Sequence, residues 1–214
     1  MEQFVPSNIH PKKIVAPASK SYAQRAIYAS TLCMTSTRIV RAGESDDVKN
    51  VTEVCKQLGA IIEQEGDDLI VHGGKFPEFA SLNVGESGLG IRLLAGILAC
   101  KGGDFNLLGE GSLKKRDMSD FRPILKQLNV RFYSNEGGLP LRIDGYAKGG
   151  LVVLDGSKSS QYLSGLLMGL PEVKEDSTLE VSTVKSKPYV DMTIDVLQKF
   201  GIEIERYKYQ SFKI

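Results

Sequence analysis

Three short polar segments, each followed by an apolar stretch, carry the residues of this sequence best suited to binding an anion. They span residues 17–21, 85–88 and 156–161 and are rich in Ser, Gly, Lys and Gln. Each is expected to begin a helix, whose first turn presents unpaired N–H groups and the positive end of the helix dipole. The three helix starts therefore predict sites for phosphate or carboxylate groups.

The first of these segments offers the most useful side chains. Ser21 and Arg25 are four residues apart, so they share one face of the expected helix and together suit one carboxylate. Lys20 adds a second cation. The segment is not a nucleotide-binding P-loop, because the glycines that this motif requires before Lys20 are missing. A capped helix with solvated Lys and Arg side chains is the ordinary alternative.

The other two helix starts add backbone and hydroxyl donors. A glycine at Gly88 lets backbone N–H groups approach a ligand closely, and Arg92 follows one turn later. Ser159 and Ser160 supply hydroxyls and Gln161 an amide. Serines at a helix start usually serve as N-caps, but two serines followed by glutamine are more than a cap needs.

Two linking segments contribute further candidates for anion binding. Residues 109–116 end in three consecutive cations, the last of which is Arg116, just before an expected helix. Residues 186–189 begin the last helix, with Ser186, a proline suited to the first turn, and Tyr189. A solvated basic loop and a plain helix start are the alternatives.

One pattern of apolar residues recurs three times, at an interval of about 70 residues. In each copy an amphipathic helix, with apolar positions at i, i+3, i+4 and i+7, ends at a residue that accepts a left-handed conformation and precedes two strands. A less charged helix and a strand come before it, the strands at 37–40, 104–108 and 178–181. The sequence therefore predicts an α/β (α+β) domain of three pseudo-threefold β-α-β-α-β-β repeats with helices partly buried inside. The repeats span about 14–80, 81–149 and 150–214.

Composition narrows the classes of partner and compartment. The formal net charge is +1, which argues against a nucleic-acid or membrane partner. Residues 1–13 contain no apolar core of a signal peptide, and the apolar run 93–100 is too short to span a bilayer. The three cysteines have no metal-ligand spacing and are expected to be buried free thiols. These features predict a cytoplasmic protein.

Taken together, the polar segments resemble the first half of the 5-enolpyruvylshikimate-3-phosphate (EPSP) synthase family over almost all 214 residues. The residues that carry the resemblance are 19–21 with Arg25, 45–47, 109–110 with Arg116, 159–161 and 186–189. The resemblance implies two domains, each an inverse α/β barrel of three repeats. Residues 14–214 would form the first domain, and residues 1–13 would belong to the second.

The resemblance also implies a reaction, a 3-phosphoshikimate 1-carboxyvinyl transfer. The enolpyruvyl group of phosphoenolpyruvate passes to the 5-hydroxyl of shikimate-3-phosphate with release of phosphate, in aromatic amino-acid biosynthesis and with no cofactor or metal. The shikimate-3-phosphate ligands would be Lys20, Ser21, Arg25, Ser159, Ser160, Gln161, Ser186 and Tyr189. The phosphoenolpyruvate ligands would be Lys20, Gly88, Arg116 and Gln161, with Lys20 also catalytic.

This sequence departs from the family pattern near the second helix start. Glu86 stands where the family usually has asparagine, so a negative charge lies near a site for an anion. It must point away, pair with a cation or weaken phosphoenolpyruvate binding. Leu89 and Leu93 also alter that wall. The acid-base carboxylates of the family come from the second half, so the chain is expected to be an inactive first half. Its partners would be the two substrates and the missing domain, and we expect a monomer.

Two other functions fit parts of the pattern. The related UDP-N-acetylglucosamine enolpyruvyl transferases have asparagine after the first lysine, where this sequence has Ser21, and lack the Ser-Ser-Gln element. A stand-alone anion-binding or regulatory module of the same fold is the alternative outside enzymes. A reading frame that continues into a second three-repeat domain would reject the latter.

Overall fold

The computed structural model describes residues 15–214, so the expected segment 1–13 lies outside the described residues. Helices and strands alternate through the described part, which confirms the mixed α/β class. The first third holds α1 (Lys20–Leu32), β1 (Ser36–Ile39), α2 (Asp46–Gln57), β2 (Ile61–Glu65) and β3 (Asp68–His72). The second holds β4 (Phe79–Asn83), α3 (Gly88–Lys101), β5 (Gly103–Leu108), the 3₁₀ helix η1 (Gly111–Lys115), α4 (Phe121–Gln127), β6 (Arg131–Asn135) and β7 (Gly138–Gly145). The last holds β8 (Gly150–Leu154), α5 (Ser160–Gly169), η2 (Leu170–Glu172), β9 (Ser177–Val181), α6 (Lys187–Lys199), β10 (Glu205–Tyr207) and β11 (Ser211–Lys213).

Serine side chains begin four of the six α-helices in residues 15–214. Ser19, Ser45, Ser87 and Ser159 each place the hydroxyl oxygen where it accepts a hydrogen bond from a backbone N–H of the first turn. A serine in this position satisfies one of the donors that a helix start leaves free. These caps fix where α1, α3 and α5 begin, and so where their unpaired N–H groups point.

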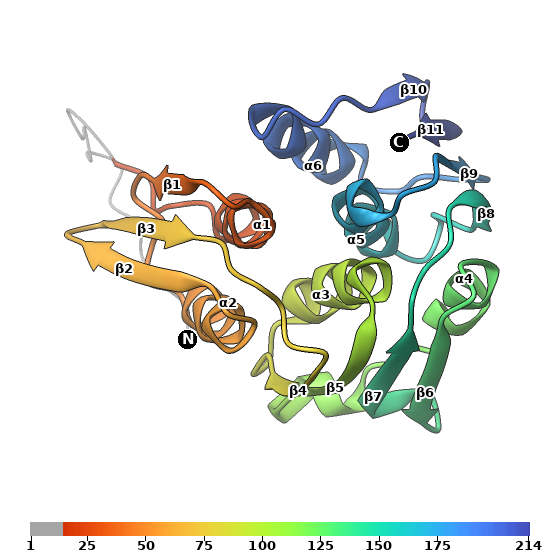
Figure 1. The fold of residues 1–214 in the computed structure, drawn as a ribbon, viewed down its shortest axis with the longest axis horizontal. Helices are drawn as coiled ribbons and strands as arrows, with labels where there is room; N and C mark the ends of the chain where they lie inside the picture. Colours follow the sequence, from red (N-terminus) through yellow and green to blue (C-terminus); the bar gives the residue numbers. More distant parts are fainter. Residues whose placement is uncertain (1–14) are drawn as a thin grey trace, which may run out of the picture.

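Each third of the chain builds its own sheet (Figure 1). The strand orders are β1-β3-β2, β4-β5-β7-β6 and β8-β9-β11-β10. The pairs β4–β5 and β8–β9 are parallel and the other pairs are antiparallel. In the described part of the chain, nothing pairs with the outer edge of β1, the position that β4 and β8 occupy in the other two sheets. The first sheet is therefore one strand narrower.

Three helices lie in the middle of the molecule and are seen nearly end-on in Figure 1: α1, α3 and α5. Almost every residue of α3 is buried, which agrees with its low charge, since Arg92 and Lys101 are its two charged residues. Gly96 of α3 and Gly165 of α5 touch through their backbones, and a Cβ at Gly96 would overlap the Gly165 carbonyl group. Because these helices pack so closely, their first turns are held in a fixed arrangement.

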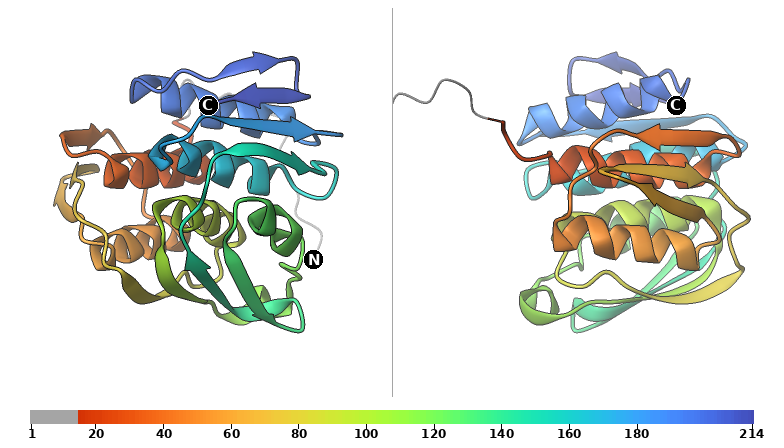
Figure 2. Two further views of the ribbon diagram at one scale, coloured as in Figure 1. Left: turned by 45° about the vertical axis from the view of Figure 1, so that its right-hand side comes forward. Right: turned by 90° about the vertical axis from the view of Figure 1, so that its left-hand side faces the viewer.

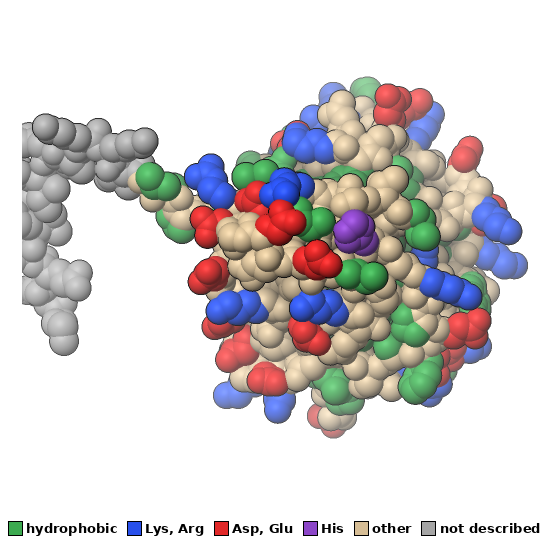
Figure 3. All heavy atoms as spheres, turned by 60° about the vertical axis from the view of Figure 1, so that its left-hand side comes forward, with side chains coloured by type: hydrophobic (Ala, Val, Ile, Leu, Met, Phe, Trp, Pro, Cys, Tyr) green, Lys and Arg blue, Asp and Glu red, His purple; other side chains and the backbone are tan. Residues whose placement is uncertain are grey.

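The remaining helices pack around this centre. Figure 2 shows α6, α1 and α2 running side by side on one flank. The outer face that carries the first sheet has mixed charge, with Lys and Arg side chains interspersed among Asp and Glu (Figure 3). No helix in the described part is long and apolar enough to cross a membrane.

Candidate functional site

The residues that the sequence nominated lie around one cavity of about 630 Å³ at the starts of α1, α3, α5 and α6. All ten nominated side chains or backbones line it, although they come from positions between 20 and 189. The complete lining is Lys20, Ser21, Gln24, Arg25, Asp47, Glu86, Gly88, Leu89, Arg116, Lys158, Ser159, Ser160, Gln161, Lys185, Ser186 and Tyr189. Five of these residues are Lys or Arg and two are Asp or Glu, so the cavity gathers a net positive charge that the sequence spreads out.

Arg25 is the most deeply placed cation of the cavity. Its side chain is fully buried, and burial lowers the pKa of its guanidinium to about 10, so it stays charged at neutral pH. The guanidinium donates to Thr193 Oγ1 (2.7 Å), to the carbonyl oxygens of Ser21 (2.8 Å) and Tyr189 (3.3 Å), and to Ser164 Oγ (3.4 Å). Four of its five N–H groups are thus used.

Ser21 and Arg25 both line the cavity, and their direct contact runs through the backbone. Arg25 donates to the Ser21 carbonyl oxygen. No Asp or Glu of residues 15–214 lies within ion-pair distance of the guanidinium. A buried cation without an acidic partner is unfavourable, and an anion placed beside it removes that penalty. One N–H of Arg25 remains for such an anion.

Lys20 lies at the mouth of the cavity rather than on its floor. Its ammonium nitrogen is 2.6 Å from Asp47 Oδ2, and 61% of its side chain is exposed. Asp47 stands at the start of α2, within the segment 45–47 that carried the family resemblance. The acid positions the lysine but also competes with any anion for its charge.

The start of α3 holds the second group of nominated residues. The guanidinium of Arg116 lies so close to the Gly88 backbone that a Cβ at Gly88 would overlap it. Arg92 donates through one nitrogen to the Gly88 carbonyl and to Gln161 Oε1, both at 3.0 Å. Gln161 therefore keeps only its NH₂ group for a ligand, while Arg92 links α3 to α5 instead of facing the cavity.

Glu86 also lines the cavity. Its carboxylate accepts a hydrogen bond from the Ser112 N–H (2.9 Å) at the start of η1. That bond lowers the pKa of Glu86, with a smaller contribution from the positive charge of Arg116. Glu86 is therefore ionised and held at the rim, beside the cation expected to bind an anion.

The serines of α5 and α6 differ in what they already bind. Ser159 Oγ accepts the Gln161 N–H (3.1 Å) as an N-cap, which leaves its hydroxyl hydrogen available. Ser160 is buried. Ser186 has a left-handed backbone (φ 56°) and makes no capping hydrogen bond. A positive φ is uncommon for serine, costs conformational free energy and is found more often at binding and active sites than elsewhere.

Sequence reasoning missed two kinds of lining residue. Gln24 lies four residues after Lys20, so helical spacing would have placed it on the same face, but glutamine on a helix is usually solvated. Lys158 and Lys185 flank the serine segments, and apart from their charge nothing in the sequence indicated that they line the cavity. Lys158 pairs with Asp120 at 2.7 Å.

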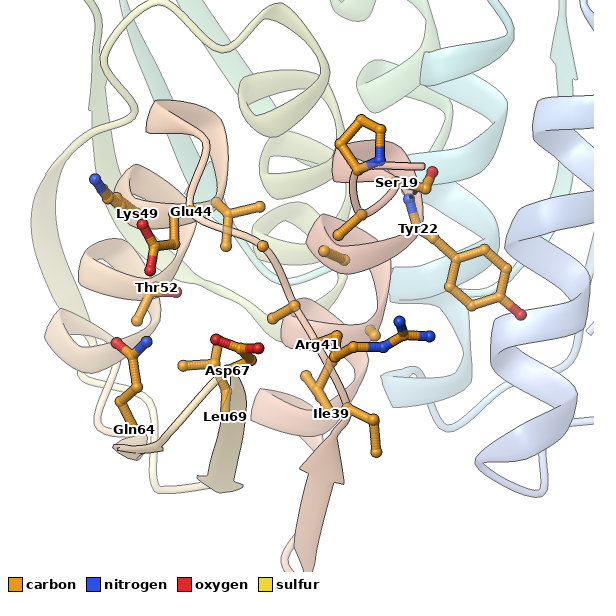
Figure 4. Close-up of a pocket in the computed structure, with 18 of the residues that line it drawn as sticks. Ser19, Tyr22, Ile39, Arg41, Glu44, Lys49, Thr52, Gln64, Asp67 and Leu69 are labelled. Carbon is orange, nitrogen blue, oxygen red and sulfur yellow. Dashed lines mark hydrogen bonds between the residues drawn. The ribbon is translucent and has the colours of Figure 1, made fainter. Parts of the chain in front are cut away.

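A second, larger hollow of about 950 Å³ shares no lining residue with the first. It lies between α1, α2, the loop that follows β1 and the β2–β3 hairpin, and Figure 4 shows Ile39 and Leu69 at its base with Arg41, Glu44 and Asp67 around it. None of the nominated residues reaches it.

The structure is also informative about metals and thiols. Among residues 15–214, no group of three or more His, Cys, Asp or Glu side chains is placed to hold a metal ion. The three cysteines are free, as expected, but only Cys55 and Cys100 are buried, whereas Cys33 is partly exposed. Burial raises the pKa of each buried thiol to about 12.

Comparison with known proteins gives one consistent result. Residues 7–214 match the family model described as EPSP synthase (3-phosphoshikimate 1-carboxyvinyltransferase). A 3-phosphoshikimate 1-carboxyvinyltransferase of Clostridium perfringens is 37% identical over 202 residues, which cover 92% of this chain and 48% of that protein. One from Methanococcoides burtonii is 37% identical over 214 residues, which cover 97% and 49%. The chain thus spans about half the length of the curated relatives it matches.

Solved structures agree on the fold. An EPSP synthase from Acinetobacter baumannii superposes with a TM-score of 0.80 at 23% identity, covering 94% of this chain and 46% of that chain. The enolpyruvyl transferase NikO from Streptomyces tendae superposes with a TM-score of 0.60 at 16% identity, covering 91% and 46%.

Proposed function

Because this chain belongs to the EPSP synthase family, we propose that it is the shikimate-3-phosphate-binding half of a 3-phosphoshikimate 1-carboxyvinyltransferase. The complete enzyme would transfer the enolpyruvyl group of phosphoenolpyruvate to the 5-hydroxyl of shikimate-3-phosphate and release phosphate. One observation carries the proposal: ten residues nominated by the family resemblance line a single cavity at four helix starts. Helix starts suit both anionic substrates.

Shikimate-3-phosphate is assigned to the side of the cavity formed by α1, α5 and α6. Its carboxylate would take the free N–H of Arg25 and the Ser21 hydroxyl, because a charge-assisted hydrogen bond from a buried guanidinium is strong. Its phosphate would take the hydroxyls of Ser159, Ser160 and Ser186. Its ring would lie against Gln161 and Tyr189, which also line the cavity.

Phosphoenolpyruvate is assigned to the side formed by α1 and α3. Its charged groups would meet Lys20, Arg116, the Gly88 backbone N–H and the NH₂ group of Gln161. We propose Lys20 as the catalytic residue of this half, since its ammonium at the mouth of the cavity can offset charge on the reacting groups.

The rest of the active site is assigned to a second half of similar length. Relatives are about twice as long as the matched part, which supports a further domain that closes the cavity. Proton transfer needs an acid or base within hydrogen-bond reach of the reacting atom, and the family takes those groups from that half. The residues 14–214 alone are therefore proposed to bind substrate without turning it over, and residues 1–13 are assigned to the second domain.

The same proposal covers the architecture. We infer that the three thirds of the chain, about 14–80, 81–149 and 150–214, are pseudo-threefold repeats of an inverse α/β barrel. The matching order of helices and strands supports this. The parallel strand absent beside β1 would come from the second half. On adding that half, outward-facing amides of β1 should become slow to exchange with solvent.

We also propose that the protein is a monomer and acts in the cytoplasm. Three free cysteines, two of them buried, are the feature that supports a reducing compartment.

The test is a chemical-shift titration of the chain with each substrate. We expect shikimate-3-phosphate to bind with a dissociation constant on the order of 0.1 to 10 mM, equivalent to about 3 to 5 kcal/mol, and more tightly than phosphoenolpyruvate. Arg25→Ala should abolish much of this binding. Lys49→Ala, an exposed change on α2, is the control and should have no effect. Equal or tighter binding of phosphoenolpyruvate would show that the two subsites are wrongly assigned.

A further inference from the structure

Gln24 is a fully buried polar side chain with an unused donor. It lines the cavity from α1, yet its Nε2 has no hydrogen-bond partner among the described residues. Buried polar groups in folded proteins are almost always paired, and an unpaired one destabilises the fold. An exception inside a binding cavity calls for a partner that arrives with the ligand.

The contacts of Gln24 fix which way its amide faces. Its Oε1 accepts the hydroxyl hydrogen of Ser87 (3.0 Å), and Ser87 Oγ in turn accepts the Gly90 N–H (3.0 Å) as the N-cap of α3. Four residues along α1, Tyr28 donates to the Gly90 carbonyl oxygen (3.2 Å). The oxygen of the Gln24 amide is therefore held against the first turn of α3, which leaves Nε2 as its unpaired end.

The same turn offers backbone donors. The N–H groups of Gly88 and Leu89 stand at positions that have no intrahelical acceptor, and both residues line the cavity. The Gln24 NH₂ group adds a side-chain donor to this pair from a neighbouring helix. Arg116 lies against Gly88 and lines the same cavity, so this part of the cavity holds several donors that suit a carboxylate or phosphate oxygen.

We propose that Gln24 is an additional ligand-binding residue for the second anion, donating from Nε2 to an oxygen of phosphoenolpyruvate held at the start of α3. The inference rests on the proposed function and adds a specificity-determining residue to it. The contacts proposed for shikimate-3-phosphate lie around Arg25 and the serines of α5 and α6, so we expect its affinity to gain nothing from Gln24.

The test replaces Gln24 by Met, which is apolar and of similar length. Titration of the variant chain should show phosphoenolpyruvate affinity reduced about tenfold, since a hydrogen bond to a charged group is lost. Shikimate-3-phosphate affinity should be unchanged. The variant loses both the unpaired NH₂ group and the oxygen that accepts the Ser87 hydroxyl hydrogen, two changes of opposite sign, so the thermal midpoint should shift little. The result that a purely structural glutamine would not produce is a loss of phosphoenolpyruvate affinity alone.

Gln127→Met is the matched control. The Gln127 amide is fully used, since it donates to the Pro123 and Val153 carbonyl oxygens and accepts the Val153 N–H. This variant should lower the thermal midpoint and leave both affinities alone. Gln24→Glu, which keeps an oxygen for Ser87 but replaces the donor, should weaken phosphoenolpyruvate binding at least as much as Gln24→Met.

The outcomes separate this inference from the function on which it rests. If the parent chain binds both substrates and Gln24→Met binds phosphoenolpyruvate as tightly as the parent, the role of Gln24 is refuted and the function stands. A lower thermal midpoint with both affinities reduced alike also refutes it, because the residue is then structural. A parent chain that binds neither substrate overturns both.

Discussion

Arg25 and Thr193 are joined by a 2.7 Å hydrogen bond from Nε to Oγ1 across 168 positions of sequence. Both side chains are buried, so the bond ties α1 to α6 behind the cavity. The orientation of the guanidinium in the cavity therefore depends on a threonine that the ligand does not touch.

Thr193→Val should weaken both the fold and the site. Valine has nearly the same shape but no acceptor, so the Arg25 Nε–H would be left unpaired at a cost of about 1–3 kcal/mol in unfolding free energy. Denaturant unfolding measures this loss, and titration with shikimate-3-phosphate measures the accompanying loss of affinity. Ser164→Ala is the graded control, since its bond to Arg25 is 3.4 Å long and its effect should be smaller.

Two glycines of α3 should respond differently to the same substitution. A Cβ at Gly88 meets the end of the flexible Arg116 side chain, which can swing aside, whereas one at Gly96 meets the backbone of Gly165. Gly88→Ala should thus keep its thermal midpoint but lose phosphoenolpyruvate binding. Gly96→Ala should destabilise the chain by about 1–3 kcal/mol or more. Equal unfolding midpoints for the two variants would contradict this packing.

Stability should fall in alkali because of the two buried thiols. The pKa of Cys55 and of Cys100 is raised from 9.0 to about 12 by burial. Between these values the unfolded chain has lost protons that the folded chain retains, so the unfolding free energy decreases as pH rises from 9 towards 12. The stabilisation is fully present below pH 9. A Cys55→Ala, Cys100→Ala double variant should show a shallower decline over this range in denaturant titrations; an unchanged slope would rule the thiols out.

The chain alone should release no phosphate from phosphoenolpyruvate and shikimate-3-phosphate. Mixing it with the unmatched second half of the Clostridium perfringens relative should restore some turnover, because that half is expected to supply the acid and base groups. Phosphate release by rigorously purified chain, without the second half, would contradict the proposed division of the active site.

Apolar spacing and helix-terminating residues predicted much of the fold, because the helices and strands they indicate are determined by residues close in sequence. Strands expected at 104–108 and 178–181 begin one residue earlier in the structure, and apolar spacing with a terminal glycine or asparagine located the amphipathic helices. Helical spacing also placed Ser21 and Arg25 on one face. These features depend on neighbours within about four residues, which a sequence displays directly.

What the sequence did not display depends on distant partners. Nothing near Arg25 indicates that it turns toward Thr193 on α6. The burial of Gln24 and the capture of Glu86 by the Ser112 N–H likewise follow from how helices from different thirds meet. The absence of a strand beside the outer edge of β1 is a property of the whole sheet, and no residue type within β1 indicates it.

The bare edge of β1 has a practical consequence for anyone handling this chain by itself. The corresponding outer strand β8 is shielded, because the Gln127 side chain occupies the N–H and carbonyl of Val153. β1 has no such shield within the described residues, and an open strand edge is a template for another chain. Concentrated samples should therefore tend to associate edge to edge, and a charged residue introduced at Val40, which is 65% exposed, is the substitution to try first against that tendency.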